Sequence, residues 1–260
     1  MPSDGAMIDW TELTLFLYIT ARISGAVLFN PVLGRRNIPG IFRSGFILVL
    51  SVFAISFAAP ETVLVPASVI ELAFRLLMEL ALGYLLGLVM NFFFYIPQLA
   101  GHSIDTQMGM TMNQVYDASA QANMSVSSML LNTLMTLLFF AGGGHHTLLR
   151  ILLTSQSIVP FGTVSVGTEA INALLELFIE CTLLAVKLCM PILAAELIGQ
   201  LGMGVLMKVI PQINVFSINI ELKVIIGLAL LLLLMAPFSE YLLEAESAML
   251  DSMSMLLGLL

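Results

Sequence analysis

Charged side chains are scarce in this chain of 260 residues. Only 10% of the residues are Asp, Glu, Lys or Arg, whereas 59% are hydrophobic, and the mean hydropathy is +1.03. A soluble protein usually carries about 25% charged residues. The shortage excludes an ordinary soluble domain and predicts an integral membrane protein embedded in a lipid bilayer.

Basic residues are missing from the N-terminal segment, and cysteine is nearly absent. Three acidic residues precede the first apolar run, and no Lys or Arg occurs before Arg22. A secretory signal begins with a basic stretch, so we expect the first apolar segment to stay in the mature protein. Cys181 and Cys189 lie within one apolar segment. This placement excludes a disulfide framework and predicts two buried, inert thiols.

Motifs of common enzymes, nucleotide sites and metal sites are missing too. The chain has no Walker A loop, dinucleotide fingerprint or HExxH pattern, and no recognisable pair of nucleophile and base. His145 and His146 are adjacent, so on a helix they point about 100° apart and cannot easily share an ion. We expect no enzyme activity, no catalytic residues, no cofactor and no metal. The charges are scattered, and no nucleic-acid partner is expected.

Long apolar runs, by contrast, are abundant. Windows of about 20 apolar residues occur at 13–33, 41–59, 67–96, 129–159, 170–201 and 224–243. They predict one all-α membrane domain, residues 1–260, with about six hydrophobic helical segments. The third window is too long for a straight span and must tilt, bend or protrude. The fourth is split by "AGGGHH", which predicts a hairpin or a broken helix.

The few basic residues predict which loops face the cytoplasm. Three arginines lie in "GRRNIPGIFRS" between the first two spans, and Lys208 and Lys223 bracket the connection between the last two. Loops rich in Lys and Arg stay cytoplasmic, so both connections should lie on that side, opposite the acidic C-terminal tail. The second connection contributes the expected cytoplasmic contact residues Pro211, Gln212, Ile213 and Asn214.

Charged and small residues recur at helical spacing inside the predicted spans. The charged stripes are Glu71, Arg75 and Glu79 in the third span, and Glu169, Glu176, Glu180 and Lys187 in the fifth. Exposing such a stripe to lipid would cost on the order of 8–10 kcal/mol, so both should face protein or water, unless the outermost residues snorkel to the interface. The third span also contains a GxxxG motif, which lets helices approach closely. The residues expected in subunit packing are Gly83, Gly87, Glu176, Glu180 and Lys187.

A polar, methionine-rich island, "HSIDTQMGMTMNQVYDASAQANMSVSS", interrupts the apolar sequence at residues 102–128. Its first part, "AGHSIDTQMGM", with "LMTLLFFAGGGHHTLLRILLTSQSIVPFG" and "KVIPQINVFSI" further on, resembles the FliR family of bacterial flagellar export-gate subunits and their injectisome relatives. The likeness covers nearly the whole chain. Two positions depart from the family pattern: Gly143 replaces an Asn, and Ala118 replaces a Pro.

The resemblance implies a subunit of a gated protein-conducting channel. In the family, the N-terminal part is similar to the partner FliP and the C-terminal hairpin to the partner FliQ, which here divides the chain into residues 1–168 and 169–260. The implied partners are FliP, FliQ, FlhB and FlhA, together with unfolded flagellar substrates. The implied location is the bacterial inner membrane, at the flagellar basal body.

The resemblance also implies a role for the polar island. In the family, the loop matching residues 101–123 plugs the central pore. Flexible methionines can seal a pore yet deform around a passing chain, and glycines lower the cost of bending. The expected plug residues are Gly101, Ile104, Asp105, Gln107, Met108, Gly109, Met110 and Met112.

Other interpretations remain open at this point. The segment could be an ordinary re-entrant or exposed loop, and the chain could belong to an injectisome rather than a flagellum. A small-solute secondary transporter would need corresponding broken helices in two similar halves, and no such internal repeat is recognisable. An intramembrane enzyme would need a nucleophile and a base.

Overall fold

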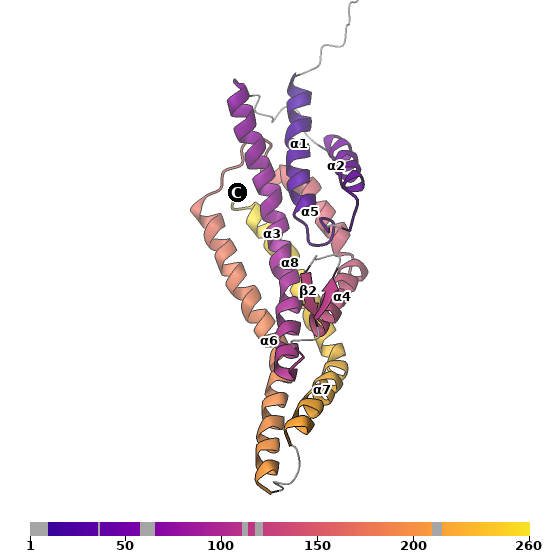
Figure 1. Ribbon diagram of the computed structural model, residues 1–260. Helices are drawn as coiled ribbons and strands as arrows, with labels where there is room; N and C mark the ends of the chain where they lie inside the picture. Colours follow the sequence, from indigo (N-terminus) through magenta and orange to yellow (C-terminus); the bar gives the residue numbers. More distant parts are fainter. Residues whose placement is uncertain (1–9, 36, 58–65, 111–113, 118–121, 210–214) are drawn as a thin grey trace, which may run out of the picture. The chain divides into compact units, whose positions relative to one another are not determined.

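The computed structural model describes residues 10–35, 37–57, 66–110, 114–117, 122–209 and 215–260. The helices are α1 Trp10–Leu28, α2 Gly40–Ile55, α3 Val69–Met108, α4 Val126–Ala141, α5 Gly144–Ile158, α6 Thr168–Val209, α7 Val215–Leu233 and α8 Met235–Leu257 (Figure 1). Between α3 and α4 the chain forms an antiparallel hairpin of β1 Gln114–Asp117 and β2 Ala122–Ser125. The predicted all-α membrane fold is confirmed, with this short hairpin as an addition.

The apolar segments are helical, but they are less uniform than six equal spans. Among the described residues, α1, α3 and α6 are each long and apolar enough to cross a membrane. Two further candidate spans are bent pairs, α4 with α5 and α7 with α8. Helix α2 has 16 residues, about 24 Å at the usual rise, which is shorter than a hydrocarbon core of about 30 Å. The broken fourth window was therefore predicted correctly, and the three long helices, the two bent pairs and the short α2 agree with about six hydrophobic helical segments.

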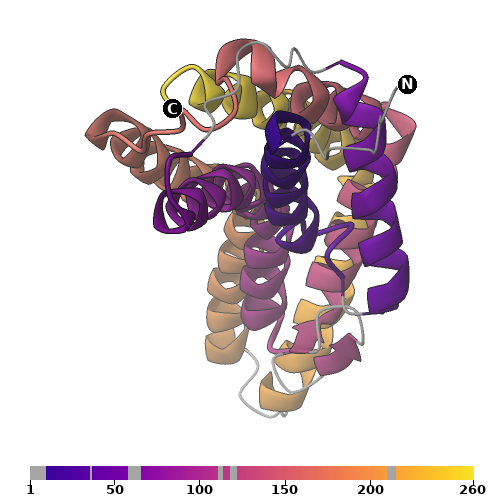
Figure 2. The same cartoon turned by 90° about the horizontal axis from the view of Figure 1, so that it is seen from above.

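The chain folds into two compact units, each assembled from distant parts of the sequence. The first unit comprises Met1–Asn91, Gly144–Glu176 and Met249–Leu260, and the second comprises Phe92–Gly143 and Leu177–Ala248. In the first unit, α1 and α2 run side by side (Figures 1 and 2). Their shared core contains Leu15, Tyr18, Ile19, Ile23 and Ile47.

Helix α3 begins with a side-chain cap that its sequence encodes. Ser68 precedes the helix, and its Oγ accepts a hydrogen bond from the backbone N–H of Glu71 at 3.2 Å. The Glu71 carboxylate in turn accepts the backbone N–H of Ala67 at 2.8 Å. This reciprocal arrangement resembles a capping box and satisfies backbone donors that no helical carbonyl can reach.

The same helix ends 40 residues later, at a glycine. Gly109 has φ of +79°, a left-handed conformation that favours glycine. Its N–H donates to the Thr106 carbonyl at 3.2 Å, and the Met110 N–H donates to the Asp105 carbonyl at 2.8 Å. These two bonds form a Schellman motif, so the helix stops at the first residue that readily leaves the helical conformation.

Candidate functional site

The structure places most of the expected plug residues in a helix rather than in a loop. Residues 101–108, predicted as the first part of loop 101–123, form the last two turns of α3. Polar side chains do not interrupt these turns because they bond back to the helix: Ser103 Oγ donates to the Leu99 carbonyl at 2.9 Å, and Thr106 Oγ1 donates to the His102 carbonyl at 2.7 Å. The irregular part of the segment therefore starts at Gly109, and the expected loop boundary is corrected to that residue.

Asp105 is buried at the junction of α3 with the start of α4. Only 1% of this residue is exposed, yet both carboxylate oxygens have partners on one residue. Oδ2 accepts the backbone N–H of Ser127 at 2.9 Å, and Oδ1 accepts a hydrogen bond from Ser127 Oγ. Ser127 lies in the first turn of α4, so a carboxylate from α3 satisfies a free donor at the positive end of α4.

One turn earlier, Gly101 brings the backbones of α3 and α4 into close contact. A Cβ at this position would lie 2.6 Å from the carbonyl carbon of Ser127 and would also clash with the backbone of Ser128. Ser128 Oγ donates to the Gln98 carbonyl at 2.7 Å and shares a hydrogen bond of 2.8 Å with Ser125 Oγ. We call Gly101, Asp105, Ser127 and Ser128 the α3–α4 clamp.

Met108 also belongs to the packed interior of the second unit. Its side chain is fully buried against α7, where a Cβ at Gly227 would lie 2.6 Å from Met108 Cγ. Ile104 is fully buried as well. We had expected these side chains among the pore-sealing residues, but helical spacing turns both toward the chain's own helices.

The remaining plug residues lie at or beyond the helix end. Gln107 and Met110 are half-buried, and Gly109 is exposed. Met112 lies outside the described residues. The hairpin that follows pairs Gln114 with Ser125, which returns the chain directly to the α3–α4 clamp.

A second buried polar cluster holds the first unit together. Arg22 on α1 is 1% exposed, and its Nε lies 2.6 Å from Glu79 Oε2 on α3. The other guanidinium nitrogens donate to Ser155 Oγ at 3.0 Å and to the Val159 carbonyl at 3.1 Å, and the group stacks over the Phe161 ring. The second Glu79 oxygen accepts the Gly162 N–H at 2.7 Å. A buried charge pair is tolerated when its hydrogen bonds are satisfied in this way.

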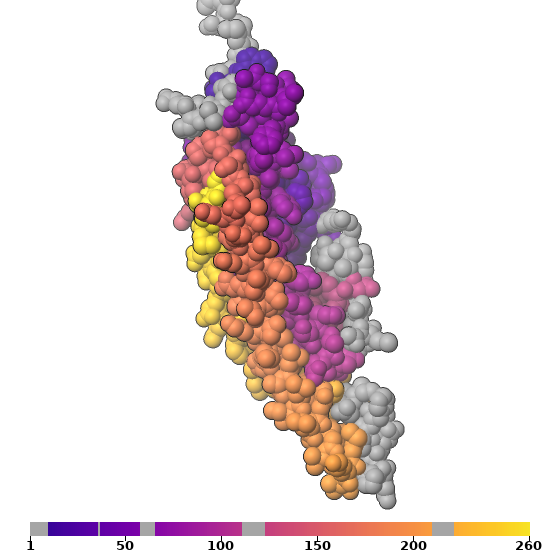
Figure 3. All heavy atoms as spheres, turned by 90° about the vertical axis from the view of Figure 1, so that its left-hand side faces the viewer, coloured from indigo at the N-terminus to yellow at the C-terminus, as the bar shows by residue number. Residues whose placement is uncertain are grey.

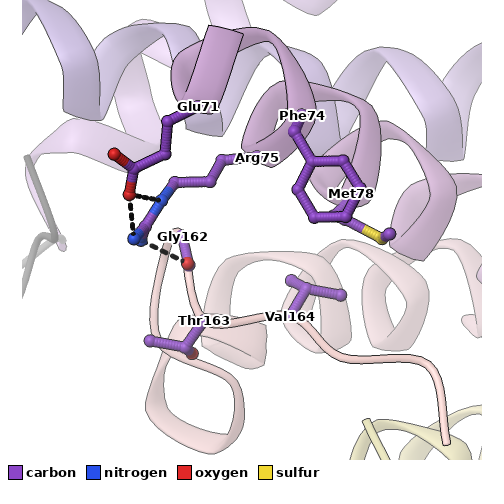
Figure 4. A pocket seen from close by; sticks show the side chains of 7 residues that line it. All are labelled: Glu71, Phe74, Arg75, Met78, Gly162, Thr163 and Val164. Atoms are coloured by element: carbon purple, nitrogen blue, oxygen red, sulfur yellow. Dashed lines mark hydrogen bonds and ion pairs between the residues drawn. The ribbon is translucent and has the colours of Figure 1, made fainter. Parts of the chain in front are cut away.

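The neighbouring pair Glu71–Arg75 lies at an open pocket of about 270 Å³ (Figure 4). Arg75 Nη2 lies 2.6 Å from Glu71 Oε1, while Nη1 donates to the Gly162 carbonyl at 2.8 Å. Phe74, Met78 and Val164 form the apolar wall. Pairing along this predicted stripe is therefore partial, because Glu79 bonds to Arg22 on another helix.

Gly83 and Gly87 pack against α1 and the residues that follow it, within the same chain. A Cβ at Gly83 would lie 2.7 Å from the backbone nitrogen of Ala26, and one at Gly87 would lie 3.0 Å from the Phe29 carbonyl carbon. We had expected these glycines to contact other subunits. In the structure they let α3 approach α1 within the subunit, and α1 and the residues after it cover the face on which the two glycines lie.

The charged stripe of α6 lies on an open surface of the chain. Glu169, Glu176, Glu180 and Lys187 are all exposed, and Figure 3 shows α6 running along the visible face. Apolar side chains such as Phe178 and Leu183 surround the stripe and are more than half exposed. The other expected contact residues, Pro211, Gln212, Ile213 and Asn214, lie outside the described residues.

The described parts of the chain offer no constellation for metal chemistry. Within them, no three His, Cys, Asp or Glu residues lie close enough together to hold an ion. The two cysteines are free and buried. The main feature of the site is instead a hairpin whose two ends are joined by the hydrogen bonds of the α3–α4 clamp.

Sequence reasoning identified Asp105 and Gly101 but missed their partners. The serines at 125, 127 and 128 immediately precede the apolar run of α4, which is the usual signal for a helix start. Reading that signal would have placed the N-terminus of α4 here. The Arg22–Glu79 pair left no local pattern, because its members are 57 residues apart.

Comparison with known proteins identifies the family. Residues 13–249 match the family described as "Bacterial export proteins, family 1". The chain is 27% identical to "Flagellar biosynthetic protein FliR" of Escherichia coli K12, over 90% of both chains. It is 30% identical to the protein of that name in Aquifex aeolicus, over 82% of this chain and 81% of the relative. It is also 23% identical to "Yop proteins translocation protein T" of Yersinia pestis, over 95% and 96%. The chain therefore belongs to the bacterial export proteins of family 1.

Proposed function

We propose that this chain is a subunit of the flagellar type III protein export gate and that the hairpin segment beginning at Gly109 closes its pore. In this role the chain would assemble with FliP and FliQ type subunits, beside FlhB and FlhA type proteins, in the bacterial inner membrane. Unfolded flagellar proteins would pass through the resulting channel. The chain itself would carry out no catalysis.

The observation that carries the closure is the hairpin between α3 and α4. The segment that leads into it departs from the helical pattern of the chain at Gly109, which has φ of +79°, and continues with Met110. Methionine is flexible and apolar, so it can fill a gap against water and rearrange around a passing chain. A rigid base with a deformable tip suits a plug.

The surface of α6 supports assembly with other subunits. Charged residues surrounded by exposed apolar side chains are costly in lipid, and Glu176, Glu180 and Lys187 lie in the open on a candidate membrane span. A neighbouring helix from another subunit would cover the charged and the apolar side chains and remove them from lipid. We therefore keep these three residues as proposed subunit contacts.

Ion leakage tests the proposed plug. Replacing Met110 and Met112 with Gly removes apolar bulk without touching the α3–α4 clamp, so we expect the assembled gate to admit ions and small dyes in the absence of export. The matched control replaces the same two residues with Leu, which restores bulk and should keep the gate closed. Dye entry is measured in cells in which recovery of the assembled gate has been verified.

An assembled Met110→Gly/Met112→Gly gate as tight as the Leu control would contradict the plug. A loss of solute uptake without a nonselective leak would instead favour a transporter.

The injectisome is the second candidate, because the Yersinia relative carries a translocation name and covers nearly the whole chain. The flagellar role is favoured by relatives from several bacteria that are named for flagellar biosynthesis. Deleting the gene distinguishes the two: loss of flagella supports the first, and loss of effector secretion with intact motility supports the second.

A further inference from the structure

The base of the proposed plug is built differently from its tip. Residues on both sides of the hairpin meet at the α3–α4 clamp, which is buried, whereas the segment that leads from α3 to the hairpin starts at the exposed Gly109. The two ends of the segment are therefore joined to each other before the chain leaves for the hairpin. This arrangement limits which part of the segment can move.

The clamp contains a buried carboxylate whose protein hydrogen bonds exist only while the contact is closed. A buried carboxylate is costly unless hydrogen bonds replace its water, and both oxygens of Asp105 obtain those bonds from Ser127. The carboxylate also lies at the N-terminus of α4, where the helix dipole favours negative charge. Separating α3 from α4 would leave the carboxylate and the Ser127 N–H without partners.

Gly101 provides an independent reason for the clamp to stay closed. The backbones of the two helices touch at this residue, where any side chain would collide with Ser127 and Ser128. Ser128 adds a hydrogen bond to Gln98 one turn earlier. Backbone contact and charged cap thus act at neighbouring turns of α3, and both would have to be lost for the helices to part.

We propose that the α3–α4 clamp remains closed while the export gate opens, and that Asp105 is the residue that positions the plug. The end of α3 then stays folded against α4 when the gate opens, because the clamp holds its last two turns. This inference rests on the proposed plug function and divides it into an anchor and a moving tip. Ile104 and Met108 belong to the anchor.

A reversible covalent lock tests the proposal. Asp105→Cys with Ser127→Cys places two thiols at the ends of an existing side-chain hydrogen bond, where we expect a disulfide to form on oxidation. The pair is introduced with Cys181→Ala and Cys189→Ala, so that no other thiol of this chain reacts. Dye entry and export of a flagellar substrate are measured in cells carrying the assembled gate, before and after oxidation and after re-reduction.

The expected results differ between the two redox states. The reduced pair lacks the charged cap, and losing a charge-assisted hydrogen bond shifts an equilibrium by roughly tenfold or more, so the gate should leak. Oxidation should seal the leak while export continues, because the clamp need not open. Asp105→Asn, which loses the charge but keeps an acceptor for the Ser127 N–H, should leak less than Asp105→Ala, which loses both.

Three outcomes would contradict the proposal that the clamp stays closed. The first is that no disulfide forms in the assembled gate, and the second is that oxidation stops export until reductant is added. The third is that the reduced pair stays tight although Met110→Gly/Met112→Gly leaks. The third result separates the two claims, since it contradicts the anchor while supporting the plug. Tightness of the methionine variant contradicts the plug itself, and the positioning role of Asp105 falls with it.

Discussion

At the scale of single residues, burial decides what each charged side chain does. Glu79 and Glu71 lie two turns apart on α3, yet Glu79 is fully buried against Arg22 while Glu71 forms a partly exposed pair with Arg75. The first pair joins α1, α3, α5 and the chain after α5 through four hydrogen bonds. The second closes one edge of an open pocket. Two charge pairs of the same chemistry therefore serve different purposes.

Breaking the buried pair should destabilise the protein strongly. In Arg22→Met, Glu79 is left as an uncompensated buried charge, which typically costs about 3–5 kcal/mol in the free energy of unfolding. Replacing both Arg22 and Glu79 with Met removes the stranded charge and should be milder than either single change. Thermal unfolding of the detergent-solubilised assembly measures the differences.

The control for this prediction is Arg75→Met, at the more exposed pair, which should cost much less because solvent screens the stranded partner. Equal losses of stability in Arg22→Met and Arg75→Met would show that burial does not set the cost.

At the scale of elements, glycines determine where helices touch and where they end. Gly83 lets α1 approach the backbone of α3, whereas Gly109 and Gly143 adopt positive φ just after α3 and α4 end. Asn and glycine share a tolerance for this left-handed conformation, so Gly143 suits the turn as the Asn of the resembled pattern would. That departure from the family pattern therefore keeps the turn.

A methyl group at Gly83 should disrupt the packing of α1 on α3. The added Cβ meets backbone atoms of α1 that cannot rotate away, and forcing extra volume into a packed site typically costs about 1–3 kcal/mol. Gly45→Ala on α2 is the matched control, since no atom of the described chain lies within 4 Å of the place that its Cβ would take. Thermal unfolding should show a loss for Gly83→Ala and little change for Gly45→Ala; equal effects would contradict the account of this contact.

Most helices could be predicted from the sequence because apolar runs of membrane length leave few alternatives. Pro97 and Pro191 both lie inside long continuous helices, where proline is tolerated if other groups satisfy the freed carbonyl. The extension of α3 to Met108 was missed because polar residues there suggested a loop. The partners of Asp105 and Arg22 were missed because contacts between distant segments leave no local pattern.

At the scale of the whole molecule, the chain exposes apolar and charged surface together. The α6 stripe of Glu169, Glu176, Glu180 and Lys187 is left open by the described parts of the subunit. A membrane protein that functioned alone would have to hold these charges against lipid. The exposed stripe therefore supports a subunit that functions inside an assembly.

Removing the stripe should weaken that assembly. With Glu176, Glu180 and Lys187 replaced by Leu, the subunit would suit lipid better and its partner helices less, so we expect less co-purification with FliP and FliQ type subunits. A control variant replaces the exposed Glu12 on α1 or Glu240 on α8 with Leu. Recovery equal to that of the unchanged chain would show that the stripe faces water or headgroups in the complete gate.

The central claim is that the segment starting at Gly109 lies on the path of the exported chain, and site-specific photocrosslinking tests it most directly. A photoreactive residue replaces Met110, and export is arrested with a flagellar substrate fused to a domain that cannot unfold. The account predicts a crosslink between Met110 and the arrested substrate, and none from Phe53 on the exposed face of α2. Arrested substrate that crosslinks from Phe53 but never from Met110 would contradict it.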